Sequence, residues 1–249
     1  MPSGLIIVTG GSRGIGAAIC RRLAADGDSI AVNYAADAAA AEATAAGIKK
    51  SGGQAQAFQA DIADPAALHG LFDEATRALG PLAGLVNNAG STGRFARADE
   101  QDAAELAKLF AINVIATIMA CKEAVLRLST RHGGPGGSIV NLSSIAARLG
   151  GLPGLGPYAA TKGAVESFTK GLATEVGPEG IRVNAVAPGM IETDMSRPLL
   201  AQGARERIEA MTPLRRVGAP EEIAEAVAWL ISPAAKFVTG SVVTVSGGR

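Results

Sequence analysis

A tyrosine and a lysine four residues apart are the clearest candidates for chemistry in this sequence. In the segment PYAATKGAVE, Tyr158 and Lys162 would lie on the same face of a helix. Tyr158 is one of only two tyrosines among 249 residues. A free phenol titrates near pH ~10, and a neighbouring ammonium favours the phenolate, so we expect Lys162 to lower the pKa of Tyr158 in a partly dry cleft. The pair would then work as an acid/base; the alternative is an ordinary pair on a helix surface.

A glycine-rich loop follows the first apolar run of the chain. In LIIVTGGSRGIGAAI, Gly10, Gly14 and Gly16 would let the backbone approach a pyrophosphate, which the free N–H groups of the next helix could bind. A glycine pattern between a strand and a helix therefore predicts a dinucleotide site.

The same loop also matches the nucleophile elbow of serine hydrolases, G-x-S-x-G, with Ser12 as nucleophile. The base would have to be His69, which falls inside an expected helix, or His132, which falls in a Gly/Pro loop. The elbow would also follow the first strand, with no earlier strands to frame it. Hydrolysis is therefore a remote alternative.

The elements that must hold these residues follow a βαβα rhythm. Apolar runs without alternation, such as LIIV and SIVNL, are typical of buried parallel strands, and Ala-rich segments between them predict helices. Asp64 before Pro65, and Pro220 before two acids, predict helix starts. We expect an α/β fold: a Rossmann-type doubly wound parallel sheet of about seven strands, with helices on both faces, in a single domain over 1–249. The expected strands are Leu5–Thr9, Ser29–Tyr34, Gln54–Gln59, Gly84–Asn87, Ser138–Leu142, Arg182–Val186 and Ser241–Val245.

Composition argues against several classes of partner and site. The chain has 23 basic and 23 acidic residues and no basic tract of five or more, so we expect neither nucleic acid nor an anionic membrane as partner. The start lacks the basic region of a signal peptide, and the best apolar stretch, FAINVIATIMAC, is short and broken by Asn113, so we expect no membrane span. Two cysteines, Cys20 and Cys121, form no disulfide framework, and two histidines without a Cys cluster predict no metal site. A reducing cytoplasm fits this composition.

Together and in order, the motifs resemble the short-chain dehydrogenase/reductase family over essentially the whole chain. The branch most similar to this sequence contains 3-oxoacyl-[acyl carrier protein] reductases and glucose-dehydrogenase-like enzymes. The matching segments are TGGSRGIG at 9–16, DI at 61–62, NNAG at 87–90, AINV at 111–114, SIVNLSS at 138–144, YAATK at 158–162, VAPGMIET at 186–193, TG at 239–240 and GG at 247–248.

The resemblance implies four catalytic residues in an oxidoreductase that transfers a hydride between a nicotinamide and a carbonyl or secondary alcohol. Tyr158 would be the general acid/base, and Lys162 would hold the nicotinamide ribose and lower the phenol's pKa. Ser144 would hydrogen-bond the substrate oxygen, where charge develops. Asn113 would sustain a water relay through its backbone carbonyl. Ser144, like Ser143, could instead cap the following segment, and Asn113 could be a packing residue.

The resemblance also implies the dinucleotide contacts. A plain turn role is the alternative for Asp61. The expected cofactor-binding residues are Gly10, Ser12, Arg13, Gly14, Ile15, Gly16, Asp61, Ile62, Asn88, Ala89, Gly90, Tyr158, Lys162, Pro188, Gly189, Ile191 and Thr193.

We expect NADP, with NAD as the alternative. Tyr34 stands where NAD-using relatives carry an acid at the end of the second strand, although Asp37 follows shortly after. Arg13 matches a basic position of NADP-using relatives, whereas Ala35 and Ala36 offer no second basic residue.

Substrate choice is expected to lie in a lid at about 190–216. Its apolar residues, Met190, Met195, Leu199 and Leu200, could line a pocket or form the core of the lid.

An acyl carrier protein is a possible partner, because Arg127 and Arg131 could form a basic patch. Glu179 weakens that hypothesis, because the acyl-carrier reductases often have a basic residue there.

The family suggests a homotetramer, in which Trp229 could belong to the core or to an interface. A non-enzymatic dinucleotide sensor is a remote alternative, because such proteins usually lose the tyrosine or the lysine, and both are present.

Overall fold

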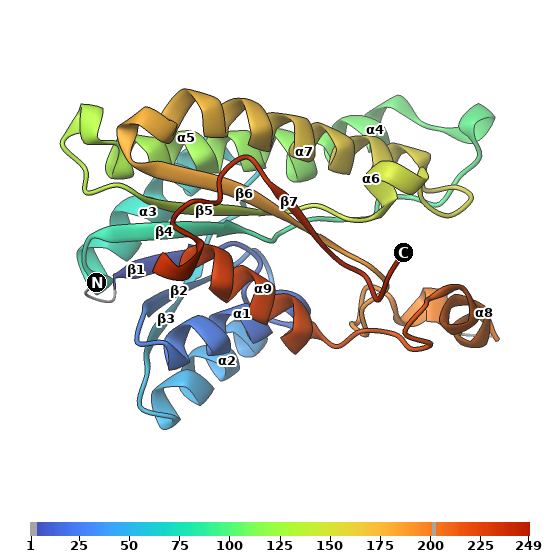
Figure 1. Ribbon diagram of the computed structural model, residues 1–249, viewed down its shortest axis with the longest axis horizontal. Coiled ribbons are helices and arrows are strands. Elements are labelled where there is room, and N and C mark those ends of the chain that lie inside the picture. Colours follow the sequence, from blue (N-terminus) through green and yellow to red (C-terminus); the bar gives the residue numbers. More distant parts are fainter. Residues whose placement is uncertain (1–3, 201–202) are drawn as a thin grey trace.

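The computed structural model describes residues 4–200 and 203–249 and contains one parallel sheet. Within that part of the chain seven strands follow the order β3-β2-β1-β4-β5-β6-β7 (Figure 1). This confirms the predicted doubly wound sheet. The strands are β1 Leu5–Val8, β2 Ser29–Tyr34, β3 Gln54–Gln59, β4 Leu82–Asn87, β5 Gly137–Leu142, β6 Ile181–Pro188 and β7 Val242–Val245.

Helices cover both faces of the sheet, and each face has its own apolar core. In β1, Ile6 and Val8 point to the core under α1, α2 and α9, whereas Leu5 and Ile7 point to the core under α3, α5 and α7 (Figure 1). This alternation is that of a strand buried on both faces. The helices are α1 Gly14–Ala25, α2 Ala38–Lys50, α3 Pro65–Leu79, α4 Ala103–Phe110, α5 Ala116–Leu128, α6 Ala146–Leu149, α7 Gly156–Val176, α8 Ala204–Met211 and α9 Pro220–Ile231. Short 3-10 turns lie at Ala98–Glu100, Thr130–His132, Gly177–Glu179, Arg197–Leu200 and Pro233–Ala235.

The predicted helix starts are confirmed, together with their chemistry. The Asp64 carboxylate accepts the Ala66 N–H at 2.9 Å, and Pro65 is the first residue of α3. At α9, Glu222 reaches back to accept the Ala219 N–H at 2.8 Å. Each acid satisfies an N–H group that has no partner within the helix.

The expectation that Asn113 breaks its apolar segment is wrong. A π-helical turn, Ala111–Ile115, joins α4 to α5, so that Ala103–Leu128 is one continuous helix. By length and composition alone this is the one helix in the described residues that could cross a membrane, and 44% of its most apolar window is buried inside the protein. Core helices of soluble proteins pass the same test, and α5 contributes Ala120, Ala124 and Leu128 to the core beside the sheet. That the protein has no membrane partner stays a prediction.

Candidate active site

The candidate site lies at the carboxyl edge of the sheet. The strand order reverses between β1 and β4, and the loops that leave these strands carry the glycine motif and the NNAG motif. In open α/β sheets, the crevice at such a reversal is where ligands bind. The loops after β5 and β6 bring Ser144 and Thr193 to the same edge.

Tyr158 and Lys162 lie together near the start of α7, as predicted. The Lys162 ammonium is 5.7 Å from the centre of the Tyr158 ring, and its Nζ donates to the Leu142 carbonyl at 2.8 Å. Lys162 is buried, whereas Tyr158 is half-buried. The helix thus presents both groups at the crevice.

The expected low pKa of the phenol is wrong for this structure. Burial raises the pKa of Tyr158, and a hydrogen bond with Ser144 opposes that rise. Burial also lowers the pKa of Lys162, from 10.5 to about 8. Loss of water disfavours the charged form of both groups, which outweighs the effect of one ammonium on the phenol. The resting site therefore holds a protonated phenol, which can donate a proton.

Ser144 faces the phenol, and its neighbour Ser143 turns inward. The Ser144 hydroxyl also accepts the Ala146 N–H at 3.1 Å, so the capping role that we considered is present beside the contact with Tyr158. Ser143 donates to Glu166 at 3.0 Å and is buried. Of the two serines, Ser144 is the one placed to meet a substrate oxygen.

Asn113 combines packing with an unusual backbone. Its side chain accepts the Ser91 N–H at 2.8 Å and donates to Thr161 at 3.0 Å, so the packing role is real. Its carbonyl lies in the π turn and accepts the Thr117 hydroxyl at 3.0 Å. π turns release carbonyls from the regular helix pattern and recur at functional sites. Thr117 and Thr161 were missed in the sequence, where nothing distinguishes them from other helix threonines.

The glycine loop fits a dinucleotide phosphate. Gly10 and Gly14 have φ values of +61° and +54°, and a Cβ on Gly16 would lie 2.1 Å from the Gly10 carbonyl oxygen. The loop therefore needs glycine at these positions. Among the described residues no side chain caps α1 and no acid lies in its first turn, so its N–H groups face the crevice free to bind an anion.

The NNAG segment packs against this loop. Asn88 donates to the carbonyls of Thr9 and Gly10 at 3.0 and 2.9 Å, and the Ala89 N–H donates to the Thr9 hydroxyl at 3.1 Å. A Cβ on Gly90 would lie 3.6 Å from the Lys162 ammonium. Asn88, Ala89 and Gly90 therefore connect the glycine loop to the Tyr158–Lys162 pair.

Four other expected cofactor contacts also have structural roles. Asp61 accepts the Ala63 N–H at 2.9 Å, which is the turn role that we considered. Ile62 is buried in the core under α3, and Ile15 packs against the core of the other face. The Ser12 carbonyl accepts the Thr44 hydroxyl at 2.9 Å.

The segment after β6 returns to the glycine loop. The Pro188 carbonyl accepts the Ile145 N–H at 3.0 Å, and a Cβ on Gly189 would lie 2.8 Å from the Cα of Ser246. Ile191 is buried and bridges to Gly218. Thr193 then lies beside Gly14, since a Cβ built on that glycine would meet the Thr193 methyl at 3.4 Å.

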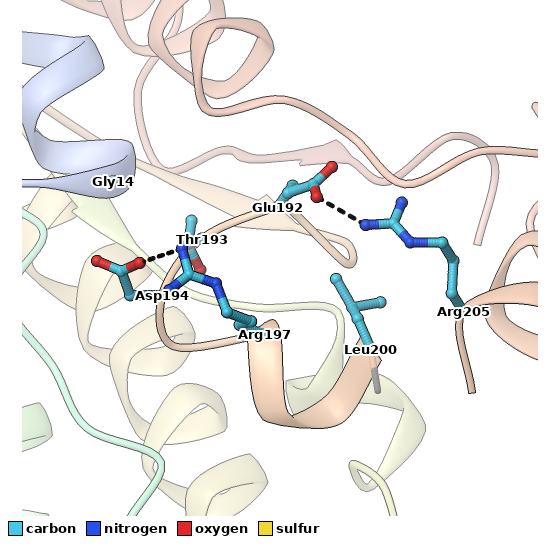
Figure 2. A pocket seen from close by; sticks show the side chains of 7 residues that line it. All are labelled: Gly14, Glu192, Thr193, Asp194, Arg197, Leu200 and Arg205. Carbon is cyan, nitrogen blue, oxygen red and sulfur yellow. Dashed lines mark hydrogen bonds and ion pairs between the residues drawn. The ribbon is translucent and has the colours of Figure 1, made fainter. Parts of the chain in front are cut away.

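A cavity of about 420 Å³ opens between the glycine loop and the segment expected to form the lid (Figure 2). Leu200 is the apolar lid residue that lines it, while Met195 is exposed. Two ion pairs cross the cavity wall, Arg205 with Glu192 at 2.7 Å and Arg197 with Asp194 at 2.6 Å (Figure 2). Residues 201–202 of the expected lid lie outside the described residues. The cavity lining is Gly14, Glu192, Thr193, Asp194, Arg197, Leu200 and Arg205.

Neither histidine lies where it could serve as the catalytic base for Ser12 in the hydrolase alternative. His69 lies on α3, 3.0 Å from Glu123 of α5 and 3.4 Å from Asp73. These helices cover the face opposite α1, which follows Ser12. His132 precedes β5 and therefore lies at the amino edge of the parallel sheet, whereas Ser12 lies at the carboxyl edge.

Comparison with known proteins decides the family. A family model described as Enoyl-(Acyl carrier protein) reductase matches residues 10–249. An uncharacterized oxidoreductase of Escherichia coli is 41% identical over 98% of this chain and 99% of its own length. The chain is a short-chain dehydrogenase/reductase. It is therefore an oxidoreductase by family, as the sequence predicted.

Solved structures of this family share the whole fold. A short-chain dehydrogenase from Burkholderia cenocepacia, in complex with NADP, is 40% identical with a TM-score of 0.89, covering 98% of this chain and 96% of that one. A 7α-hydroxysteroid dehydrogenase complexed with NADH is 33% identical with a TM-score of 0.92, covering 98% and 93%. The seven-stranded sheet of this short-chain dehydrogenase/reductase is thus the family's own.

Proposed function

We propose that this short-chain dehydrogenase/reductase interconverts a carbonyl and a secondary alcohol, with Ser144, Tyr158 and Lys162 as its catalytic residues. The observation that carries the proposal is the convergence of these three side chains beside an uncapped helix N-terminus. A bound nicotinamide dinucleotide would supply or accept the hydride. Solved relatives that hold NADP and NADH support such a cofactor.

In this proposal the three side chains divide the work at the substrate oxygen. The protonated Tyr158 phenol donates its proton to the oxygen of a carbonyl substrate, and Ser144 donates a hydrogen bond to the same oxygen, where negative charge develops. Lys162 orients the ribose, and its ammonium places a positive charge beside the Tyr158 ring. The Asn113 carbonyl, with the Thr117 hydroxyl on one side, accepts a water that returns protons toward Lys162.

The residues present fit the dinucleotide along the loop edge. The pyrophosphate would lie at the N-terminus of α1, with Gly10, Gly14 and Gly16 allowing close approach and Thr193 on the lid side. The adenosine would lie toward Asn88 and Asp61. The segment 190–216 would close over the substrate as a lid.

The cofactor is proposed to be NADP, on the basis of Arg13. This side chain is 65% exposed and lies 3.9 Å from Asp37, beyond the end of β2 where a 2′-phosphate would be bound. Tyr34 places a phenol, not an acid, at the end of that strand. A guanidinium can bind a phosphate with two parallel hydrogen bonds.

We expect Arg13→Ala to lower kcat/KM for NADP by about tenfold and to change kcat/KM for NAD by less than about twofold, since one charge-assisted contact is lost only with the phosphate. Steady-state kinetics with both cofactors measure this. The matched control is Arg21→Ala on the outer side of α1, where Arg21 pairs with Glu221. Equal losses with both cofactors, or a wild type that prefers NAD, would show the NADP proposal to be wrong.

A small carbonyl compound is preferred over an acyl carrier protein as substrate. Of the two arginines expected to form a basic patch, Arg127 is already closely paired. Arg127 is 19% exposed and contacts Glu123 and Asp73, whereas Arg131 is 76% exposed and lies 3.9 Å from Glu179. The charge of Arg127 is therefore largely compensated before any acidic partner arrives, which leaves Arg131 as the one of the two that could still attract such a partner.

The experiment that tests the function is a screen of purified protein against a panel of ketones and 3-oxoacyl thioesters, followed by nicotinamide absorbance. Oxidation of NADPH with a ketone supports the proposal. Activity confined to acyl carrier thioesters would favour the acyl-carrier alternative. Binding of NADPH without turnover of any substrate would instead indicate a sensor.

The protein is also proposed to form a cytoplasmic homotetramer. Large apolar side chains are exposed in the π turn before α5, on α9 and after the 3-10 turn that follows α9: Ile115 at 56%, Trp229 at 41% and Phe237, which is fully exposed. If these side chains lie together on one face, they would form the kind of apolar patch that marks a contact surface. Light scattering after gel filtration should give a molar mass four times that of the chain. The Phe237→Ser variant should give a lower molar mass, because it loses an apolar contact between subunits. A monomeric wild type would contradict the proposal.

A further inference from the structure

Glu166 is a buried carboxylate that the proposed mechanism does not use. It lies on α7 one turn after Lys162, so Tyr158, Lys162 and Glu166 follow one another on the same face of the helix. Its relative exposure is 8%. Burying a charge is unfavourable unless it is paired and hydrogen-bonded, and an apolar residue of similar size would pack here without that penalty.

The two partners of this carboxylate lie on either side of the proposed catalytic serine. On one side, the Ser143 hydroxyl donates to Glu166 Oε1 at 3.0 Å. On the other, Arg148 Nε lies 3.5 Å from Glu166 Oε2, while Arg148 also donates to Thr244 of β7 at 2.8 Å. Ser144 lies between these anchors in the sequence, two residues after the end of β5, and one carboxylate thus holds the segment on both sides of it.

The same carboxylate belongs to the helix that carries the phenol. The Ser143 hydroxyl also lies 3.3 Å from the Lys162 carbonyl, so two contacts from one hydroxyl join the segment directly after β5 to α7. A shift of about 1 Å between a catalytic donor and its partner is enough to lower rates strongly.

We propose that Glu166 is a positioning residue, which holds the segment around Ser144 in the orientation where the Ser144 hydroxyl meets the Tyr158 phenol. This proposal rests on the function proposed above. It assigns Glu166 no contact with substrate or dinucleotide, and it acts only through Ser143 and Arg148.

Two substitutions at Glu166 separate positioning from simple stability. Glu166→Leu removes the acceptor, and we expect kcat to fall about tenfold with KM for NADPH changed less than about twofold. Glu166→Gln keeps an oxygen for the Ser143 hydroxyl, and we expect kcat within about threefold of wild type. The matched control is Glu175→Leu, an exposed acid on the same helix, which should behave as wild type. Wild-type kcat in Glu166→Leu, or an equal loss in Glu166→Gln, would overturn the proposal.

A titration tests the same proposal without turnover. In a Tyr34→Phe background Tyr158 is the last tyrosine, and its ionisation can be followed by ultraviolet difference spectroscopy. Because the Ser144 hydrogen bond lowers the pKa of Tyr158, Glu166→Leu should shift the midpoint upward. An unchanged midpoint overturns the positioning proposal, while absence of turnover in the wild type counts only against the proposed function.

Ser143→Ala serves if Glu166→Leu does not fold. It removes the hydroxyl and leaves the carboxylate beside Arg148, so we expect a loss in kcat of about threefold and an upward shift of the Tyr158 midpoint. A folded Ser143→Ala protein with wild-type kcat and an unchanged midpoint would overturn the proposal as well.

Discussion

Tyr158→Phe is expected to lower kcat by about 10²–10⁴-fold and to leave the Kd for NADPH unchanged. The substitution removes the phenolic proton and keeps the ring, so the crevice retains its shape. Tyr158 is half-buried with a raised pKa and a hydrogen bond to Ser144, which makes it a proton donor at neutral pH. Single-turnover absorbance measures the chemical step, and fluorescence titration with NADPH measures binding.

Two further measurements make this first prediction specific. The thermal midpoint of Tyr158→Phe should match that of wild type, because the hydroxyl contributes one hydrogen bond at the edge of the crevice. Ser144→Ala should also lose activity, by less than Tyr158→Phe, since it removes a hydrogen-bond donor and not the proton. Full activity in Tyr158→Phe would remove the phenol from the mechanism altogether.

Lys162→Met is expected to abolish most activity and, at neutral pH, to stabilise the cofactor-free protein. Burial lowers the pKa of Lys162 from 10.5 to about 8, so the charged ammonium is unfavourable in the fold. The gap between these two values corresponds to at most roughly 3 kcal/mol of lost stability, and the hydrogen bond to Leu142 offsets part of it. We expect the free energy of unfolding to rise by about 1–3 kcal/mol in the variant.

The pH dependence of this second prediction has a definite sign. Below about pH 8, Lys162 is protonated in both the folded and the unfolded chain, so wild type bears the full cost of burying the charged ammonium. Between about 8 and 10.5 the unfolded chain binds the proton and the folded chain has released it, so wild-type stability rises with pH relative to the variant. The difference in the free energy of unfolding between Lys162→Met and wild type should therefore shrink as pH rises.

Urea unfolding of both proteins at about pH 7 and about pH 10 measures this difference in the free energy of unfolding. Lys170→Met is the matched control, because Lys170 is exposed on the same helix, and it should leave stability nearly unchanged at both pH values. A Lys162→Met protein that is less stable than wild type at neutral pH would contradict the assigned penalty. If Lys162→Met is more stable than wild type by the same free energy at both pH values, the stabilisation comes from packing and not from the removed charge.

Much of this protein could be predicted from its sequence because the decisive signals are local. Runs such as LIIV are typical of a strand buried on both faces, so the strands were predicted to within about two residues, and Asp64 with Pro65 predicted a helix start. The spacing of Tyr158 and Lys162 placed both on one helix face, and the glycines predicted the loop that needs positive φ. The ordered motifs also identified the family, which the comparisons show.

What only the tertiary structure decided concerns groups whose partners are distant in sequence. The raised pKa of Tyr158 and the lowered pKa of Lys162 come from burial by several elements, so a two-residue motif could not give their direction. The pairing of Arg127 with Asp73 joins residues 54 positions apart and compensates a patch that looked basic in the sequence. Glu166 looked like any helix acid until β5 placed Ser143 against it. Local pattern fixes backbone geometry, whereas solvation and charge depend on which elements pack together, and that is decided by the complete fold.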